Sequence, residues 1–248
     1  MLRLLWRLPV ILIATIVCQT ALILIAPWRD RCRVWWLRWR NPLMRGWGRA
    51  LLFGFGARVR VTGTPPTGSF LLVSNHLSYV DIPLLAAVVD AAFVAKADIA
   101  KWPFLGTTVR AGDTIFIDRG QRRDLVRVID QMEAKWALPL GAIIFPEGTS
   151  SPGETILPFR PSLLEVAATR HKPVHWAVIR YHADDPKAPA RDSVAWHGDA
   201  LLVPHLFRLL CMPGFTAHIH FGATAVQATH RKELAAKLHD AASRALAR

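Results

Sequence analysis

The longest apolar run of the chain lies near its N-terminus. Residues 8–26 carry no charge, and only three of these nineteen residues are polar. Nineteen helical residues extend about 28 Å, close to the hydrocarbon thickness of a bilayer. The run predicts a membrane helix that crosses the bilayer or dips into it. A cleaved signal peptide is the alternative, because Arg3 and Arg7 precede the run, but its length and the absence of an A-x-A site after it favour the membrane helix.

Residues 31–54 show a second pattern, in which arginines are interleaved with apolar and aromatic residues. This pattern is typical of a helix lying among lipid headgroups. Asn41, Pro42 and Gly46 predict a break or a bend in it. We assign residues 1–58 to a membrane anchor with a basic, tryptophan-rich interfacial helix, and residues 59–248 to a folded domain.

From about Val59 onward the pattern changes to short apolar runs separated by turns, which is typical of strands. Predicted strands cover residues 70–73, 93–95, 114–117, 142–145, 174–180, 193–196 and 216–221. Amphipathic periodicity predicts helices at residues 122–136, 163–170 and 232–247. Strands that alternate with helices predict an α/β fold with a mixed sheet flanked by helices.

The distribution of charge separates two classes of partner. Residues 1–60 hold eleven arginines and one acid, so +10 of the total net charge of +13 lies there, together with six of the ten tryptophans. Basic charge mixed with tryptophan beside an apolar run is typical of a membrane surface, whereas a nucleic-acid binder more often spreads its charge over the folded domain. We therefore expect a membrane partner and no nucleic acid. If the helix crosses, the positive-inside rule places the folded domain on the cytoplasmic side of the inner membrane.

Cysteine and histidine spacing argues against a metal site. The three cysteines are scattered and form no C-x-x-C pair, which excludes a disulfide framework and a thiolate zinc site. His171 and His175 have helical spacing for a metal pair, but Pro173 lies between them and a predicted strand follows. We expect no metal.

The first candidate for chemistry is the segment from Ser74 to Asp81, directly after the predicted strand 70–73. A histidine with a reference pKa of about 6.5 can accept a proton at neutral pH. On one regular helix, His76 and Asp81 would point about 140° apart. They can meet only if His76 lies in the loop and Asp81 in the first turn of the next helix. The alternative is that Asp81 is a first-turn acid favoured by the helix dipole.

Two further segments place polar residues at the ends of predicted strands. GDTIFIDR (112–119) ends with an acid and Arg119, and FPEGTSS (145–151) runs from a strand into a tight turn. Glu147 could orient a basic group or a hydroxyl, and Gly148 permits close backbone approach to a substrate.

Together with NHLSYVD (75–81), LPFRPSL (157–163) and a looser KPVHWAVI (172–179), these blocks resemble the glycerolipid acyltransferase family, whose bacterial members convert lysophosphatidic acid to phosphatidic acid. The resemblance covers about residues 70–180. It implies a catalytic His76 and Asp81 and an acyl-CoA or acyl-carrier-protein donor. It also implies acceptor binding by a set of residues in the later blocks: Arg119, Glu147, Gly148, Thr149, Ser150 and Arg160.

The chemistry implied by this resemblance requires no other cofactor. His76 removes the proton of an acceptor hydroxyl, which attacks the thioester carbonyl, while Asp81 holds the imidazole ring. Nearby donors must stabilise the oxyanion. No acyl-enzyme is needed, and the sequence contains no G-x-S-x-G elbow.

The sequence departs from the family pattern at Ser150, where an arginine usually helps to hold the acceptor's phosphate. Lysophosphatidic acid is the expected acceptor by family default, with Arg119 and Arg160 able to compensate. The F-P-E-G-T-S-S block followed by L-P-F-R is also similar to enzymes that acylate lyso-ornithine lipid, which lacks a phosphate. Ala177, in place of a second proline, is interpreted as a packing variation.

Two other classes of protein remain as alternatives. A non-catalytic membrane adaptor could keep the fold as a binding module, although the presence of His76, Asp81, Arg119 and Glu147 counts against it. An esterase would need an activated nucleophile or a positioned water, and the sequence signals neither.

Overall fold

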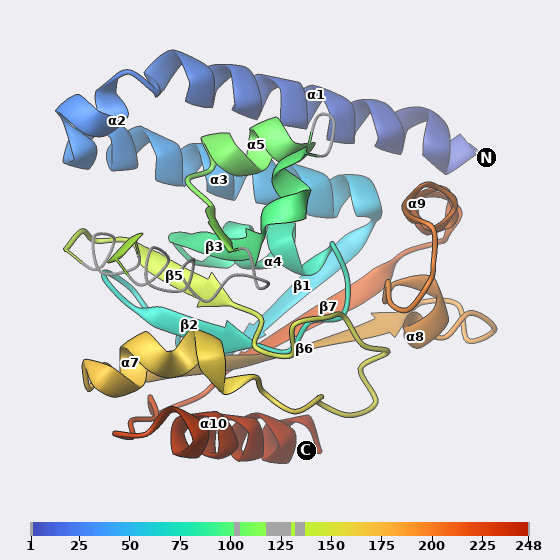
Figure 1. Ribbon diagram of the computed structural model, residues 1–248. Coiled ribbons are helices and arrows are strands. Elements are labelled where there is room, and N and C mark those ends of the chain that lie inside the picture. The colour runs from blue at the N-terminus through green and yellow to red at the C-terminus, as the bar shows by residue number, and fades with distance from the viewer. Residues whose placement is uncertain (1, 102–104, 118–129, 132–136, 248) are drawn as a thin grey trace.

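The computed structural model describes residues 2–101, 105–117, 130–131 and 137–247 (Figure 1). Its centre is a sheet with the strand order β1-β7-β6-β2-β5-β3-β4. Neighbouring strands are parallel except β6 and β7, which are antiparallel, so the predicted mixed sheet is confirmed. The strands are β1 (Ala57–Thr62), β2 (Leu71–Ser74), β3 (Ala91–Lys96), β4 (Ile115–Ile117), β5 (Gly141–Ile144), β6 (Val174–Ala183) and β7 (Phe215–Phe221).

Helices cover both faces of this sheet (Figure 1). One layer holds α1 (Leu2–Ile25), α2 (Trp28–Arg31), α3 (Arg33–Phe55), α4 (Asp81–Val88) and α5 (Leu105–Ala111). The opposite layer holds α7 (Glu165–Thr169), preceded by the 3₁₀ helix η2 (Pro161–Leu164), and α10 (Arg231–Leu246). The short α8 (Ala190–Ser193) and α9 (Leu202–Cys211) lie at the end of the sheet where β6 ends and β7 begins, and the 3₁₀ helix η1 (Ala97–Lys101) follows β3.

The degree of burial of each strand explains whether the hydrophobic pattern of the sequence predicts it. All four residues of β2 and of β5 are buried, as expected of central parallel strands covered on both faces. By contrast, β1 is an exposed edge strand in which arginine alternates with valine, and it was not among the predicted strands.

One prediction about regular structure is wrong. Residues 193–196 do not form a strand, because Ser193 ends α8 and the Trp196 N–H donates to the Leu77 carbonyl instead of to a neighbouring strand. A break or a bend was expected near Pro42 and Gly46: α3 runs through both residues without a break, and the bend stays a prediction. The predicted helix 122–136 lies outside the described residues except at 130–131.

The predicted apolar helix is α1, which has the length and composition of a membrane span. It lies alongside α3 and is tied to the end of α9, where the Arg7 guanidinium donates to the carbonyl oxygens of Leu210, Met212 and Pro213. Only 11% of its most apolar window is buried. The outer surface of α1 and α3 therefore exposes many large apolar side chains, among them Leu5, Leu12, Ile13, Ile16, Val17, Trp35, Trp39 and Phe53.

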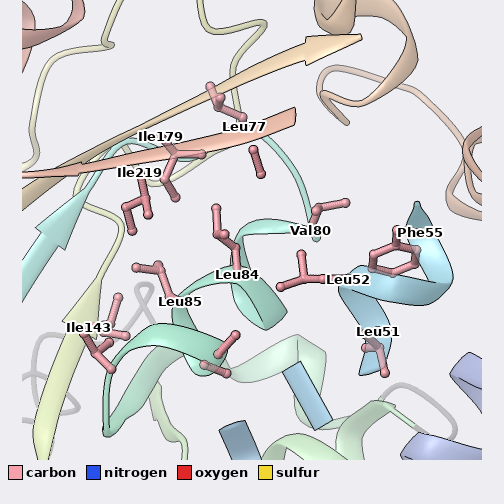
Figure 2. Packing of buried hydrophobic residues seen from close by; sticks show 14 of the residues in the cluster. Leu51, Leu52, Phe55, Leu77, Val80, Leu84, Leu85, Ile143, Ile179 and Ile219 are labelled. Carbon is pink, nitrogen blue, oxygen red and sulfur yellow. The ribbon is translucent and has the colours of Figure 1, made fainter. Parts of the chain in front are cut away.

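Helix α3 joins this outer layer to the sheet. Figure 2 shows Leu52 and Phe55 of α3 close to Val80 and Leu84, on the core side of the helix. The crossing with α4 is tight, because a Cβ placed on Gly48 would lie 2.5 Å from the Pro83 carbonyl oxygen. The division of the chain at residue 58 stays a prediction.

Candidate active site

The candidate active site begins where β2 leaves the centre of the sheet. The Asn75 side chain is buried and bonds in both directions to the β6 backbone: its Nδ2 donates to the Ile179 carbonyl at 3.0 Å, and its Oδ1 accepts the Ile179 N–H at 2.7 Å. These bonds fix the path of the chain directly before His76. Helix α4 then begins at Asp81, which confirms the predicted strand–loop–helix arrangement.

His76 and Asp81 meet in this loop. The His76 Nδ1 lies 2.7 Å from the Asp81 Oδ2, and Asp81 is fully buried, whereas 23% of the His76 side chain is exposed. An ionised carboxylate only accepts hydrogen bonds, so Nδ1 carries the proton and Nε2 is the basic nitrogen. The geometry is therefore that of a general base whose tautomer is set by an acid.

Asp81 accepts three further hydrogen bonds. The backbone N–H groups of Leu77 and Ser78 donate to Oδ2 at 2.7 and 3.0 Å, and the Tyr181 hydroxyl donates to Oδ1 at 2.5 Å. Four donors thus compensate for burial of the carboxylate. Burial, followed by the nearby carboxylate, raises the pKa of Tyr181 well above its ordinary value, so this phenol stays protonated as a donor.

Glu147 fixes the backbone of the loop that carries His76. Its Oε1 accepts the His76 N–H at 2.8 Å, and its Oε2 accepts the Leu157 N–H at 3.1 Å. Burial raises the pKa of Glu147, and the two backbone hydrogen bonds oppose that shift. Glu147, which the family resemblance assigned to acceptor binding, therefore positions the backbone of His76. Gly148 makes the turn that follows, with a φ of 77° that favours glycine.

The other residues assigned to acceptor binding lie in different surroundings. The Ser150 hydroxyl donates to the Trp196 carbonyl at 2.5 Å, and so links the glutamate block to the segment after α8. Thr149 and Arg160 are exposed, and the Arg160 backbone N–H donates to the Pro146 carbonyl. Arg119 lies outside the described residues.

The imidazole ring of His76 is also fixed by stacking. It lies 4.2 Å from the Phe145 ring at an interplanar angle of 20°. Since Phe145 directly follows β5 and His76 follows β2, two adjacent central strands deliver the two rings to the same edge of the sheet. This edge is where parallel strands commonly place catalytic groups.

Tyr79 connects the loop that carries His76 to α9. Its hydroxyl lies 3.0 Å from the His205 Nδ1, and the His205 Nε2 lies 3.0 Å from the Ala195 carbonyl. The carbonyl accepts only, so Nε2 carries the proton and Tyr79 donates to Nδ1. Burial is the main cause that lowers the pKa of His205, which agrees with a neutral ring. Sequence reasoning missed both Tyr181 and His205, because each lies more than 95 residues from its partner in the loop.

Comparisons with known proteins show the family of the chain. The family model Acyltransferase matches residues 58–180. A lyso-ornithine lipid O-acyltransferase of Pseudomonas aeruginosa is 35% identical, over 84% of this chain and 79% of its own length. The corresponding enzyme of Rhizobium meliloti is 32% identical, over 80% and 72%. A 1-acyl-sn-glycerol-3-phosphate acyltransferase of Neisseria meningitidis is 30% identical, over 80% and 77%.

The fold has a solved counterpart. The crystal structure of the 1-acyl-sn-glycerophosphate acyltransferase PlsC from Thermotoga maritima matches with a TM-score of 0.67 over 96% of both chains, at 20% identity. The segment with His76 and Asp81 thus lies inside the matched family region, and relatives at 30% identity or more span most of the chain. The chain belongs to the Acyltransferase family and is an acyltransferase.

Proposed function

We propose that the protein transfers a fatty acyl group from a thioester donor to the free hydroxyl of a lysolipid. The observation that carries the proposal is the His76–Asp81 pair, with its 2.7 Å contact and a basic Nε2 on a partly exposed ring. The hydroxyl proton moves to Nε2 as the oxygen attacks the thioester carbonyl. The tetrahedral oxyanion then collapses, the C–S bond breaks, and the imidazolium protonates the leaving thiolate. The products are an ester and a free thiol.

We propose a lyso-ornithine lipid as the preferred acceptor. At the position where the family pattern has a phosphate-binding arginine, this chain has Ser150, whose hydroxyl bonds to the Trp196 carbonyl. A hydroxyl used in this way brings no positive charge to the site. Three relatives at 31 to 35% identity are named lyso-ornithine lipid O-acyltransferases.

Lysophosphatidic acid is the second candidate acceptor. The Neisseria relative named for this substrate is 30% identical over most of both chains. Arg160, an exposed cation that follows the glutamate block, and Arg119 are the residues proposed to hold its phosphate. The donor is proposed to be acyl-CoA or acyl-carrier protein, with no other cofactor.

The proposed location is the inner membrane, with the catalytic domain facing the cytoplasm. The exposed apolar side chains of α1 and α3 suit contact with acyl chains, and the arginines of α2 and α3 suit anionic headgroups. Because Arg7 bonds to three carbonyls at the end of α9, α1 is held against the folded domain along its N-terminal part. We propose that it lies in one leaflet and does not cross the bilayer.

The test is acyl transfer by the purified protein in detergent, with lyso-ornithine lipid and lysophosphatidic acid offered side by side. Each acceptor is assayed with acyl-CoA and with acyl-carrier protein, and His76→Ala serves as the inactive control. Turnover that depends on His76 and is faster with lyso-ornithine lipid is expected. Turnover of neither acceptor by folded protein would refute the proposed reaction and favour the membrane adaptor.

A further inference from the structure

The outward face of helix α9 exposes large apolar side chains. Val203 and Phe207 are four residues apart, so they lie on the same face of the helix, and they are 62% and 47% exposed. Leu201, directly before the helix, is 73% exposed. The sequence of α9 contains no acidic residue, and Arg208 is exposed in its last turn. Exposed apolar residues that gather on one element are typical of a contact surface.

The inward face of α9 is attached to the loop that carries His76. His205 and Leu209, which are also four residues apart, are both buried. The His205 Nδ1 accepts the Tyr79 hydroxyl at 3.0 Å, and the rings of these two residues lie edge to face at 5.6 Å. The helix is therefore fixed to the loop on one side, while its apolar side chains point away from the loop on the other.

The apolar face of α9 continues the exposed surface of α1. Arg7 of α1 donates to three backbone carbonyls at the end of α9, and Figure 1 shows the N-terminal part of α1 beside this helix. The turns of α1 around Arg7 also expose large apolar side chains, namely Leu2, Leu5 and Trp6. Two helices that are distant in the sequence thus contribute to one apolar surface.

Resting on the proposed acylation of a lysolipid, we propose that the outward face of α9 inserts among the acyl chains of the leaflet that holds the acceptor. Val203 and Phe207 enter the leaflet, and Arg208 lies among anionic headgroups. A lipid surface is favoured over a second copy of the chain because each copy carries a net charge of +13, and two copies repel each other. Through His205, the inserted helix keeps Tyr79 and its loop at the membrane surface.

Kinetics with two forms of the acceptor test this proposal. Val203→Ser and Phe207→Ser are expected to raise the KM for a lysolipid presented in vesicles about fivefold or more, because less apolar surface leaves water. The KM for a short-chain lysolipid dissolved as a monomer is expected to stay unchanged. Val61→Ser is the matched control, because Val61 is 42% exposed on the edge strand β1, and it is expected to change neither KM. An equal rise for both forms of the acceptor, or the same rise in the control, would overturn the proposal.

Fluorescence quenching tests the insertion directly, without the reaction. Val203→Cys is labelled with an environment-sensitive fluorophore in a full chain that also carries Cys32→Ser and Cys211→Ser, since the remaining Cys18 is buried. Lys232→Cys, on α10 in the opposite layer, is labelled as the control. Vesicles of phosphatidylglycerol and phosphatidylethanolamine with brominated acyl chains are expected to quench the label at position 203 and to leave the label at position 232 unquenched.

The two experiments separate the failure of this proposal from the failure of the proposed function. Quenching at position 203 without turnover of any lysolipid would support insertion of α9 and refute the reaction. Turnover by protein bound to vesicles, with no quenching at position 203, would refute the insertion and leave the reaction intact. A label at position 203 that becomes shielded as the protein concentration rises without vesicles, and that brominated lipids do not quench, would assign the face to a second copy and overturn the proposal.

Discussion

Replacing Asp81 by asparagine separates the positioning role of this carboxylate from its charge. In the wild type, Oδ2 accepts hydrogen bonds from His76, Leu77 and Ser78, so the amide oxygen of asparagine must occupy that position. The amide nitrogen then faces the Tyr181 hydroxyl, which is the donor to Oδ1 in the wild type. Because a hydroxyl hydrogen can rotate, Tyr181 can become the acceptor of this bond. Asp81→Asn can therefore keep the three hydrogen bonds to Oδ2 and the tautomer of His76, but the Tyr181 hydroxyl hydrogen loses its carboxylate acceptor.

The variant nevertheless loses the negative charge that stabilises the imidazolium during catalysis. Two unit charges about 4 Å apart attract each other by about 4 kcal/mol at an effective dielectric constant of about 20. The asparagine dipole retains part of this, so we expect kcat to fall about 10²- to 10³-fold, at about 1.4 kcal/mol per factor of ten. The free energy of unfolding is expected to fall by about 1–3 kcal/mol, since the buried Tyr181 hydroxyl hydrogen loses its acceptor.

The assay combines acyl-transfer kinetics with urea unfolding in detergent, for Asp81→Asn and for Asp81→Ala. The alanine variant leaves buried N–H groups unpaired and is expected to lose about 3–5 kcal/mol of stability as well as activity. Tyr181→Phe, made in the wild type and in Asp81→Asn, completes a double-mutant cycle. It is expected to lower the free energy of unfolding by about 1.5–3 kcal/mol in the wild type, where the acceptor is charged, and by about 1 kcal/mol in Asp81→Asn. Activity of Asp81→Asn within a factor of ten of wild type, or its unfolding like Asp81→Ala, would refute this reasoning.

Two further predictions concern stability. Gly48→Ala is expected to lower the free energy of unfolding by about 1–3 kcal/mol, because its Cβ would press on the Pro83 carbonyl. Gly46→Ala is expected to raise it by about 0.5–1 kcal/mol, because its Cβ meets nothing within 4 Å. Equal shifts of the two variants in thermal unfolding would contradict this. Burial raises the pKa of Glu147, so its contribution to stability is fully present below the unfolded-state pKa and is lost as pH rises through the folded-state pKa. Glu147→Gln is therefore expected to gain stability relative to wild type as pH rises above the ordinary carboxyl value of 4.5, measured by urea unfolding across pH; a constant difference would show that the ionisation is not linked to folding.

The parts of the fold that could be predicted from the sequence are those that depend on neighbours along the chain. The strands β2 and β5 are buried on both faces, so each is an uninterrupted apolar run between turns. His76 and Asp81 are five residues apart, and a loop followed by a helix is enough to bring them together. Their contact therefore follows from local structure alone.

Contacts between distant segments could not be predicted in this way. Tyr181 reaches Asp81 because β6 pairs with β2 in a register that places Ser74 beside Ala177, and no local pattern contains that information. The apolar residues Val194 and Ala195 suggested a strand, but they are buried as part of the core beside α8 and α9. Their hydrophobicity indicates that they are buried, but a buried residue can belong to an irregular segment as well as to a strand.

The arrangement of helices fixes the separation between the outer surface of α1 and α3, proposed to meet the membrane, and the proposed base His76. Helix α3 exposes Trp35 and Trp39 on its outer side, and on its inner side packs tightly against α4, whose first residue is Asp81. Helix α9 likewise exposes Phe207, while its buried His205 bonds to Tyr79 of the catalytic loop. Two helices that carry outward apolar residues are thus rigidly connected to the same loop. The depth at which the proposed lipid hydroxyl would meet the His76 Nε2 is therefore set by this packing.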